Sequence, residues 1–218
     1  MKMKMFFVLL VSIFLISGIV GAEDVDILVP DITGVTEITA DGSLADWVGV
    51  PGFFIYSTMV ADADDIAGEA DVSATAWVAY DQGNFYLAVR INDDSLIFEQ
   101  SGGDIWNGDC VEVWIGDSQT GFTINADGEE YVHNWRGGFD TDLFDFAVVE
   151  ELNGWTVEAI IPLTELEKVI DVGSGQEFRL AIGINDADQP GAGRSGQIYF
   201  PDTWSWGATD TFAQAVFE

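Results

Sequence analysis

The stretch SATAWVAYDQGNFYLAVRIN, residues 73–92, alternates apolar with polar or small side chains on both sides of a turn that contains glycine. Successive side chains of a β-strand point to opposite faces of the sheet, so this alternation is typical of strands with one buried face. In the second half, the apolar side chains from Phe85 to Ile91 share one face. The stretch therefore predicts a β-hairpin that turns at residues 81–84.

The same period of two recurs along most of the chain. Single strands are predicted over residues 110–116, 177–186, 196–200 and 211–217. Residues 143–162 predict a second hairpin that turns at Asn153-Gly154. Only PLTELEKV, residues 162–169, predicts a helical turn, which Pro162 or Thr164 begins. Many short strands and one short helix indicate an all-β fold, specifically an antiparallel, jelly-roll-like β-sandwich.

The first 22 residues have the pattern of a secretory signal. Lys2 and Lys4 precede an apolar run, and the small residues Val20-Gly21-Ala22 precede the acidic Glu23. We expect cleavage after residue 22, so that residues 23–218 form a single domain outside the cell or at its surface. If the segment stays uncut, it would instead anchor the domain to a membrane, which is the only membrane contact that we expect.

The remaining domain is strongly acidic. All 38 Asp and Glu residues lie after residue 22, whereas Lys2 and Lys4 belong to the signal, so five of the seven Lys and Arg residues remain. Such a surface repels nucleic acids and anionic membranes, and it leaves neutral ligands and divalent cations as partners. Cys110 is the only cysteine, so no intramolecular disulfide can form.

The sequence offers little for catalysis. His133 is the single histidine, and neither a Gly-x-Ser-x-Gly elbow nor a His-Glu-x-x-His pair is present. Pairs of carboxylates carry no weight, because a chain with 38 acidic residues contains many by coincidence. We therefore expect a protein that is not an enzyme.

Tryptophan is a better indication of function. Five of the eight tryptophans lie in segments rich in Gly or Asp, namely Trp47, Trp106, Trp135, Trp204 and Trp206. Flat aromatic faces bind the apolar faces of sugar rings, while neighbouring polar groups bind the hydroxyls. The alternative is that each of these tryptophans closes one end of the sandwich. Trp77, Trp114 and Trp155 lie inside predicted strands and are expected to be packing residues.

The strand at residues 110–116 predicts a place for Trp106. If Val111 and Val113 face the core, Glu112 and Trp114 must face away from it. A loop that enters this strand can fold its tryptophan over the same outer face. Trp106 and Glu112 would then line one concavity, with an aromatic plate beside a hydrogen-bond acceptor.

Several segments together resemble a known family. These segments are ITADGSLADW (38–47), AWVAYDQGNFYLAVRINDDS (76–95), WNGDCVEVWIGD (106–117), WTVEAIIPLTEL (155–166) and GQEFRLAIGINDAD (175–188). In this order they are similar to a family 9 carbohydrate-binding module, from about Glu37 to Phe217. The resemblance implies a β-sandwich that binds sugars, often at the reducing end of a glycan, between two tryptophans. It also implies that calcium binds at the loops and that the domain assists glycoside hydrolases in polysaccharide breakdown.

The resemblance suggests roles for individual residues. The family's first aromatic plate and its acceptor match Trp106 and Glu112, and its basic donor falls near His133 and Arg136, of which we favour Arg136. The second plate would come from the loop after the strand that ends in INDAD (184–188), as Trp204 or Trp206, with Trp204 favoured by its distance from that strand. Calcium binds six to eight oxygen ligands. Candidate ligands lie in three segments: Asp41 and Asp46; Glu69 and Asp71; Asn185, Asp186 and Asp188.

Two other classes of protein remain open. Sandwiches that resemble the haem subunits of some exported dehydrogenases hold haem with a Met and a Lys, and the domain has one of each, Met59 and Lys168. A structural cell-surface or adhesive protein is the third class. The leading hypothesis is a secreted module that binds a neutral oligo- or polysaccharide.

Overall fold

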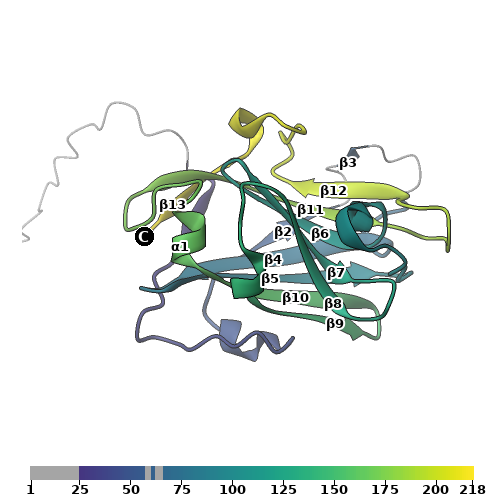
Figure 1. Ribbon diagram of the computed structural model, residues 1–218, viewed down its shortest axis with the longest axis horizontal. Coiled ribbons are helices and arrows are strands. Elements are labelled where there is room, and N and C mark those ends of the chain that lie inside the picture. The colour runs from purple at the N-terminus through teal and green to yellow at the C-terminus, as the bar shows by residue number, and fades with distance from the viewer. Residues whose placement is uncertain (1–24, 57–59, 62–65) are drawn as a thin grey trace, which may run out of the picture.

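The computed structural model describes residues 25–56, 60–61 and 66–218, which form two β-sheets packed face to face (Figure 1). The larger sheet has the order β1(Ile27–Val29), β13(Ala213–Phe217), β11(Glu177–Asp186), β6(Cys110–Ile115), β7(Ser118–Ile124) and β8(Glu130–Arg136). At β11 it also pairs with β12(Gly196–Phe200), which in turn pairs with β3(Val60–Ala61). The smaller sheet has the order β2(Gly52–Ile55), β4(Val72–Tyr80), β5(Asn84–Asp93), β10(Gly154–Pro162) and β9(Asp145–Glu151). This architecture confirms the predicted all-β sandwich.

Among the described strands, all pairs are antiparallel except that of β1 with β13, which is parallel. The helical segments are short. In the described part of the chain the only α-helix, α1(Leu163–Leu166), begins directly after Pro162, one of the two predicted starting residues. The 3-10 helices there are η1(Leu44–Trp47), η2(Gly102–Asn107), η3(Thr141–Leu143) and η4(Thr209–Thr211). No helix in the described ranges is long and apolar enough to span a membrane.

Apolar side chains alternate with other side chains along each strand, and the apolar ones form the core between the two sheets. Val111, Val113 and Ile115 of β6 face the buried cluster, together with the inward apolar residues of β5 from Phe85 to Ile91. Trp155 of β10 is fully buried in the same cluster, as expected for a packing tryptophan. Because these residues face inward, the opposite side chains of β6 face outward on the larger sheet.

The first hairpin forms as predicted, because β4 and β5 pair from Val72 with Asp93 to Tyr80 with Phe85. The second hairpin turns one residue earlier than predicted. Gly154 already pairs with Glu151, which leaves Leu152 and Asn153 as the loop. Gly154 has a φ of +132°, and a side chain there would collide with the carbonyl oxygen of Ile91, so glycine belongs in the strand rather than in the turn.

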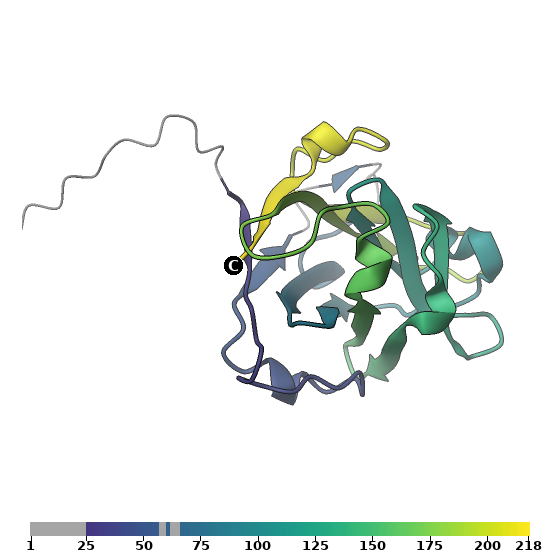
Figure 2. The same ribbon diagram turned by 60° about the vertical axis from the view of Figure 1, so that its left-hand side comes forward.

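Trp47 is a structural residue rather than a ligand plate. Its indole Nε1–H donates to Oε1 of Glu158 at 2.7 Å, and both side chains are buried. Oε2 of Glu158 also accepts from the backbone N–H of Gly42 at 2.6 Å, which fixes the segment from residue 39 to residue 47 on the outer face of the smaller sheet. Figure 2 shows this segment on the side of the sandwich opposite the C-terminal loop that carries Trp204.

Candidate functional site

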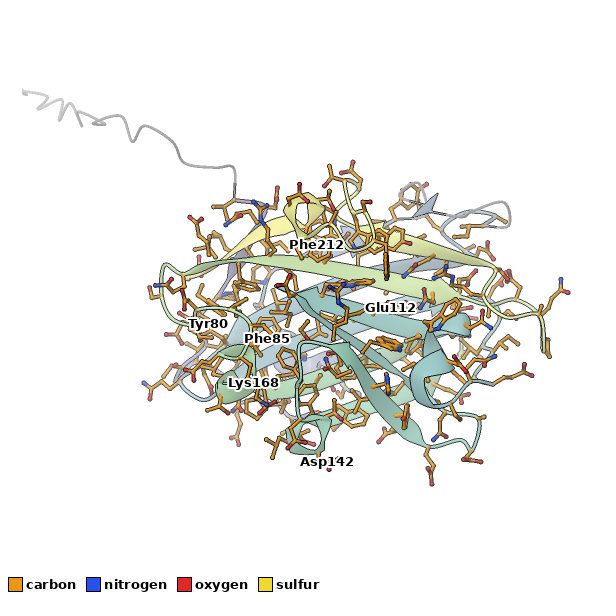
Figure 3. The ribbon with its side chains drawn as sticks, turned by 45° about the horizontal axis from the view of Figure 1, so that its top comes forward. Tyr80, Phe85, Glu112, Asp142, Lys168 and Phe212 are labelled. Atoms are coloured by element: carbon orange, nitrogen blue, oxygen red, sulfur yellow. The ribbon has the colours of Figure 1, made fainter. Side chains whose placement is uncertain are left out.

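A cavity of about 640 Å³ lies on the outer face of the larger sheet. Its aromatic wall consists of Trp106, Trp114, Trp135, Tyr199, Trp204 and Trp206. Its polar lining consists of Glu112, Gln119, Arg136, Arg194 and Gln197. Figure 3 labels Glu112 on the face of this sheet that is turned toward the viewer. Residues from four strands and three loops therefore meet around Glu112.

Two glycines make room for the aromatic wall. Gly121 of β7 and Gly183 of β11 are the direct partners of Glu112 on its two neighbouring strands. A Cβ atom on Gly183 would lie 3.2 Å from the ring of Tyr199 and 2.7 Å from the side-chain amide of Gln197. A Cβ atom on Gly121 would overlap the indole of Trp135. Because both positions lack a side chain, the rings can lie close to the sheet on either side of Glu112.

Trp106 lies in η2 at one side of the cavity, and 42 % of its surface is exposed. The guanidinium carbon of Arg194 lies 5.3 Å from the centroid of the Trp106 ring, within the range of a cation–π contact. Arg194 comes from the loop between β11 and β12, about ninety positions further along the chain. The ring of Trp106 thus offers an accessible aromatic face, and the guanidinium of Arg194 holds it in place.

Glu112 forms the polar floor of the cavity. Its Oε1 accepts from Nδ2 of Asn185 at 2.6 Å, and its Oε2 accepts from Nε2 of Gln119 at 2.7 Å. Only 3 % of the residue is exposed, and this burial raises the pKa of the carboxyl, while the bonds from Asn185 and Gln119 and the charge of Arg194 oppose the rise. Glu112 therefore holds these two amide side chains, and that of Gln197 at 3.4 Å, as a fixed hydrogen-bonding surface, as well as lining the cavity itself.

The amide network continues toward β12. The guanidinium Nη1 of Arg194 donates to Oδ1 of Asn185 at 3.1 Å and to Oε1 of Gln197 at 2.8 Å. The Tyr199 hydroxyl donates to the same Gln197 oxygen at 2.6 Å. Side-chain amides carry both donors and acceptors, which suits them to the hydroxyls of a sugar.

The loop at residues 201–208 supplies another wall. Trp204 stacks on Tyr199 with ring centroids 4.0 Å apart and an interplanar angle of 15°, and it tilts against Trp114 at 5.1 Å. Trp206 is 70 % exposed. Both therefore line the cavity, but Trp204 is packed on the sheet whereas Trp206 extends into solvent.

β8 supplies the basic side of the cavity. Arg136, at the end of β8, lines the cavity, whereas His133 is not part of the lining and packs its ring against Trp135 at 5.2 Å. The indole Nε1–H of Trp135 donates to the carbonyl oxygen of Gly103 at 2.8 Å, which fixes η2 beside β8. Of the two basic candidates, Arg136 is the one whose position suits a ligand contact.

A second polar site lies where the ends of several strands meet. Asp71, Asp93, Asp109, Asp186 and Asp188 form a carboxylate cluster. Carboxylate oxygens of Asp71, Asp186 and Asp188 lie within 4.8 Å of one another, and so do those of Asp93, Asp109 and Asp186. Asp186 belongs to both groups, so it is the centre of the cluster.

The carboxylate cluster has the features of a cation site. Asp186 is only 1 % exposed, and neither of its carboxylate oxygens has a hydrogen-bond partner; Oδ2 of Asp93 is likewise buried without one. Burial first, and then the neighbouring carboxylates, raise the pKa of Asp186 to about 8. Burial also raises the pKa of Asp93 to about 7 and of Asp109 to about 9. Oxygen-only ligands of this number and charge fit Ca²⁺.

Comparison with known proteins identifies the family. The family model described as "Carbohydrate family 9 binding domain-like" matches residues 52–218. The chain belongs to this family. No curated protein matches the chain.

Two solved structures resemble this family 9 domain. One is a family 9 carbohydrate-binding module from Caldicellulosiruptor kristjanssonii in complex with cellotriose, at 20 % identity and a TM-score of 0.65, over 88 % of this chain and 93 % of that chain. The other is a module from the same organism in complex with glucose, at 20 % identity and a TM-score of 0.64, over 88 % and 95 % of the two chains. At this identity the likeness establishes the shared β-sandwich.

The structure brings together most of the predicted ligand residues of this family 9 domain. Trp106, Glu112, Arg136, Trp204 and Trp206 line one cavity. Trp114, which we expected to be only a packing residue, is buried and also lines the cavity, because its position on β6 places it two residues from Glu112 on the same face.

The predicted metal ligands divide into two sets. Asp71, Asp186 and Asp188 meet in the carboxylate cluster. Asp41, Asp46 and Glu69 do not join it, and their role as metal ligands stays a prediction. Asp46 instead accepts from the hydroxyl of Thr39 at 2.8 Å, Asp41 caps its own turn by accepting from the N–H of Ser43, and Glu69 is an exposed loop residue. Asn185 is also absent from the cluster, because its side chain points to Glu112 instead.

Several site residues were not predicted. Arg194, Gln119, Gln197 and Tyr199 line the cavity, and Asp93 and Asp109 complete the cluster. Gln197 and Tyr199 share one face of a predicted strand, so alternation could have placed them together. Asp93 and Asp109 flank predicted strands, but an acidic residue at a strand end carries no signal in a chain with 38 acidic residues.

The haem hypothesis stays an untested prediction. Met59 lies outside the described residues. Nζ of Lys168 forms an ion pair with Oε2 of Glu165 at 2.6 Å and donates to the carbonyl oxygen of Gly138. Figure 3 shows Lys168 well away from Glu112.

Proposed function

We propose that this domain binds a neutral saccharide in the cavity above Glu112. The observation that supports this is the combination of an accessible indole, Trp106, with a floor of amide side chains ordered by Glu112. Aromatic faces exclude water from the C–H surfaces of a sugar ring, and amides satisfy its hydroxyls. The related modules from Caldicellulosiruptor kristjanssonii were solved with cellotriose and with glucose, both of which are neutral saccharides.

Trp106 and Trp204 are the two plates in this proposal. The ring of Trp204 is already stacked on Tyr199, so it loses little side-chain freedom when a ligand binds. Trp206, which is far more exposed, would close over the ligand at the rim. Arg136 would donate to a hydroxyl, and Glu112 would accept from one while it orients Asn185 and Gln119. In a more specific form of this proposal, which the family resemblance suggests, the sugar bound in the cavity is the reducing end of a glycan.

Charge supports a neutral ligand. The chain has a formal net charge of −31, which disfavours the approach of acidic polysaccharides. Inside the cavity the carboxylate of Glu112 offsets part of the charge of Arg136 and Arg194. The walls contribute stacking surface, and the floor contributes amides, so an uncharged hydroxyl-rich ring is the best match.

The carboxylate cluster would hold Ca²⁺ in the working protein. Asp186 would provide the central ligand, with Asp71, Asp93, Asp109 and Asp188 around it. The two buried oxygens of Asp186 that lack hydrogen-bond donors support this assignment, since burial of an unpaired charge is costly. A bound cation would link the ends of β5 and β11 to the segment that precedes β6.

The proposed place of action is outside the cell. Residues 1–22 would direct secretion and be removed, and N-terminal sequencing of secreted protein would then begin at Glu23. An intact Met1 on membrane-bound protein would contradict cleavage. The domain would act as a non-catalytic partner of glycoside hydrolases in polysaccharide breakdown.

Titration of cellotriose into the protein, followed by tryptophan fluorescence and calorimetry, tests the function. We expect saturable binding with a change in emission for the wild-type protein and a much smaller change for Trp106→Ala. The matched control is Trp77→Ala, a partly buried tryptophan on the other sheet, which should bind cellotriose normally. A glycan array then defines the preferred sugar. No response to any neutral glycan would reject the proposal.

A further inference from the structure

Two chain segments take part in both the cavity and the carboxylate cluster. The first segment, residues 106–112, carries Trp106 and Glu112 of the cavity, and Asp109 of the cluster lies between them. The second segment begins with Asn185 of the cavity floor, which is followed immediately by Asp186 of the cluster. The same segment continues to Arg194 at the cavity wall. A displacement of either segment at the cluster therefore also changes the cavity.

Direct hydrogen bonds tie the two segments together. Oδ1 of Asp109 accepts from the backbone N–H of Ala187 at 2.8 Å, on the cluster side. Oδ1 of Asn107 accepts from the backbone N–H of Arg194 at 3.2 Å, on the cavity side. Gly193, with a φ of +81°, packs so closely on Asn107 that a Cβ atom there would lie 2.8 Å from its side-chain amide. Asn107 is therefore a backbone contact, beside the contact of Arg194 with Trp106, through which the Arg194 loop rests on the turn that carries Trp106.

The charges of the carboxylate cluster act between these two segments. Asp109 and Asp186 come from different segments, and their carboxylate oxygens lie within 4.8 Å of each other and of Asp93. Carboxyls at this separation and burial cannot all ionise on their own, because their charges would repel strongly, so without a cation they hold protons. A divalent cation among them replaces those protons and attracts the carboxylates of both segments. It thereby pulls the segment of Arg194 against the segment of Trp106.

We propose that a divalent cation in the carboxylate cluster raises the affinity of the cavity for sugar, by holding the Arg194 loop against Asn107 and the Trp106 turn. This inference rests on the proposed sugar site and adds a regulation of that site. The coupling is reciprocal: bound sugar must raise the affinity for the cation by the same factor. A typical coupling corresponds to a change of about 5- to 150-fold, and we expect about tenfold here.

Calorimetry on the full domain tests the coupling. Cellotriose affinity is measured with saturating calcium and with chelator at matched ionic strength, and calcium affinity is measured with and without saturating cellotriose. Terbium luminescence, sensitised by nearby tryptophan, reports cation binding independently of sugar. We expect cellotriose to bind about tenfold more weakly in chelator and calcium to bind tighter by the same factor when cellotriose is present.

Variants at Asn107 separate the link from the two sites. Asn107→Ala removes the acceptor for the Arg194 N–H and should leave terbium binding within about twofold of wild type, while the coupling factor falls toward one. Asn107→Asp keeps an oxygen acceptor at the same position and should retain the coupling. Asp186→Asn should abolish terbium binding. Its cellotriose affinity should equal the weaker affinity that the wild-type protein has in chelator, whether calcium or chelator is present.

The outcomes distinguish the coupling from the sugar site itself. Cation binding together with equal cellotriose affinity in calcium and in chelator would overturn the coupling and leave the sugar site standing. Full coupling in Asn107→Ala would overturn the proposed route. Cation binding without any response to cellotriose in either condition would reject the sugar site, and the coupling with it.

Discussion

Asn185 and Asp186 are consecutive residues of β11, and their side chains belong to two different sites. Asn185 donates to Glu112 at 2.6 Å in the floor of the cavity, whereas Asp186 lies among the carboxylates of the cluster with both of its oxygens unpaired. The alternation of a β-strand explains this separation, because neighbouring side chains point to opposite sides of the sheet. The end of one strand thus supports a ligand cavity and a cation site at once.

Trp106→Ala should remove most of the sugar affinity and preserve the fold. Loss of one stacking face corresponds to about 1–3 kcal/mol, or roughly ten- to a hundredfold in affinity. The comparison variant is Trp155→Ala, which truncates a fully buried ring and should cost about 3–5 kcal/mol of stability. Both are measured by cellotriose calorimetry and by urea unfolding. A stable Trp106→Ala protein with wild-type affinity would exclude Trp106 as a plate.

Trp204→Ala should weaken sugar binding more than Trp206→Ala. Trp204 is held on Tyr199 at 4.0 Å, so its position is defined before the ligand arrives, whereas Trp206 must give up freedom that it has in solvent. Calorimetry on the two single variants provides the measurement. The opposite order of affinities would assign the second plate to Trp206.

Glu112→Gln should lower both affinity and stability. The new amide nitrogen would face Nδ2 of Asn185 or Nε2 of Gln119, so one buried donor would lose its acceptor, at a cost of about 1–3 kcal/mol. A matched control is Glu177→Gln on β11, where the exposed carboxylate accepts from Gln214 outside the cavity. Chemical unfolding and cellotriose titration of both variants check the result. Equal behaviour of the two variants would show that the Glu112 network is dispensable.

Calcium should raise the melting temperature. A ligand that binds only the native state adds about 2.7 kcal/mol at a hundred times its dissociation constant. Asp186→Asn should abolish the shift, whereas Asp41→Asn, outside the cluster, should keep it. Differential scanning calorimetry in calcium, in chelator and in a monovalent salt of equal ionic strength measures it. A shift of the same size in the monovalent salt would indicate general screening of the acidic surface.

In chelator, the free energy of unfolding should fall as the pH rises from about 4 to about 9. The folded pKa values of Asp93, Asp186 and Asp109, at about 7, 8 and 9, all exceed the ordinary value of 3.8. The folded protein therefore holds protons that the unfolded chain has already released, so the stabilisation present at low pH is lost as the pH rises through these values. Urea unfolding across this range tests the trend. Asp186→Asn should show a shallower decline, and an identical decline would place its origin outside the cluster.

The alternation of apolar residues was sufficient to predict the architecture. Residues 73–92 predicted one hairpin, and β6 predicted that Glu112 and Trp106 share an outer face; both are observed. These predictions succeed because burial of one strand face is a local property that repeats every two residues. The turn of the second hairpin was displaced by one residue, because the preference of glycine for positive φ does not say whether it belongs to the loop or to the strand end.

Contacts between distant segments could not be read from the sequence. Arg194 reaches Trp106, and Asp109 joins Asp186, only because β6 and β11 are neighbours in the larger sheet. Strand order depends on how all the strands together bury the core, and no single segment encodes it. The sequence by itself thus determined the sandwich, its outward faces and the loop tryptophans. The tertiary structure alone decided which acidic residues converge and which amides surround Glu112, since those contacts form only when the sheet is complete.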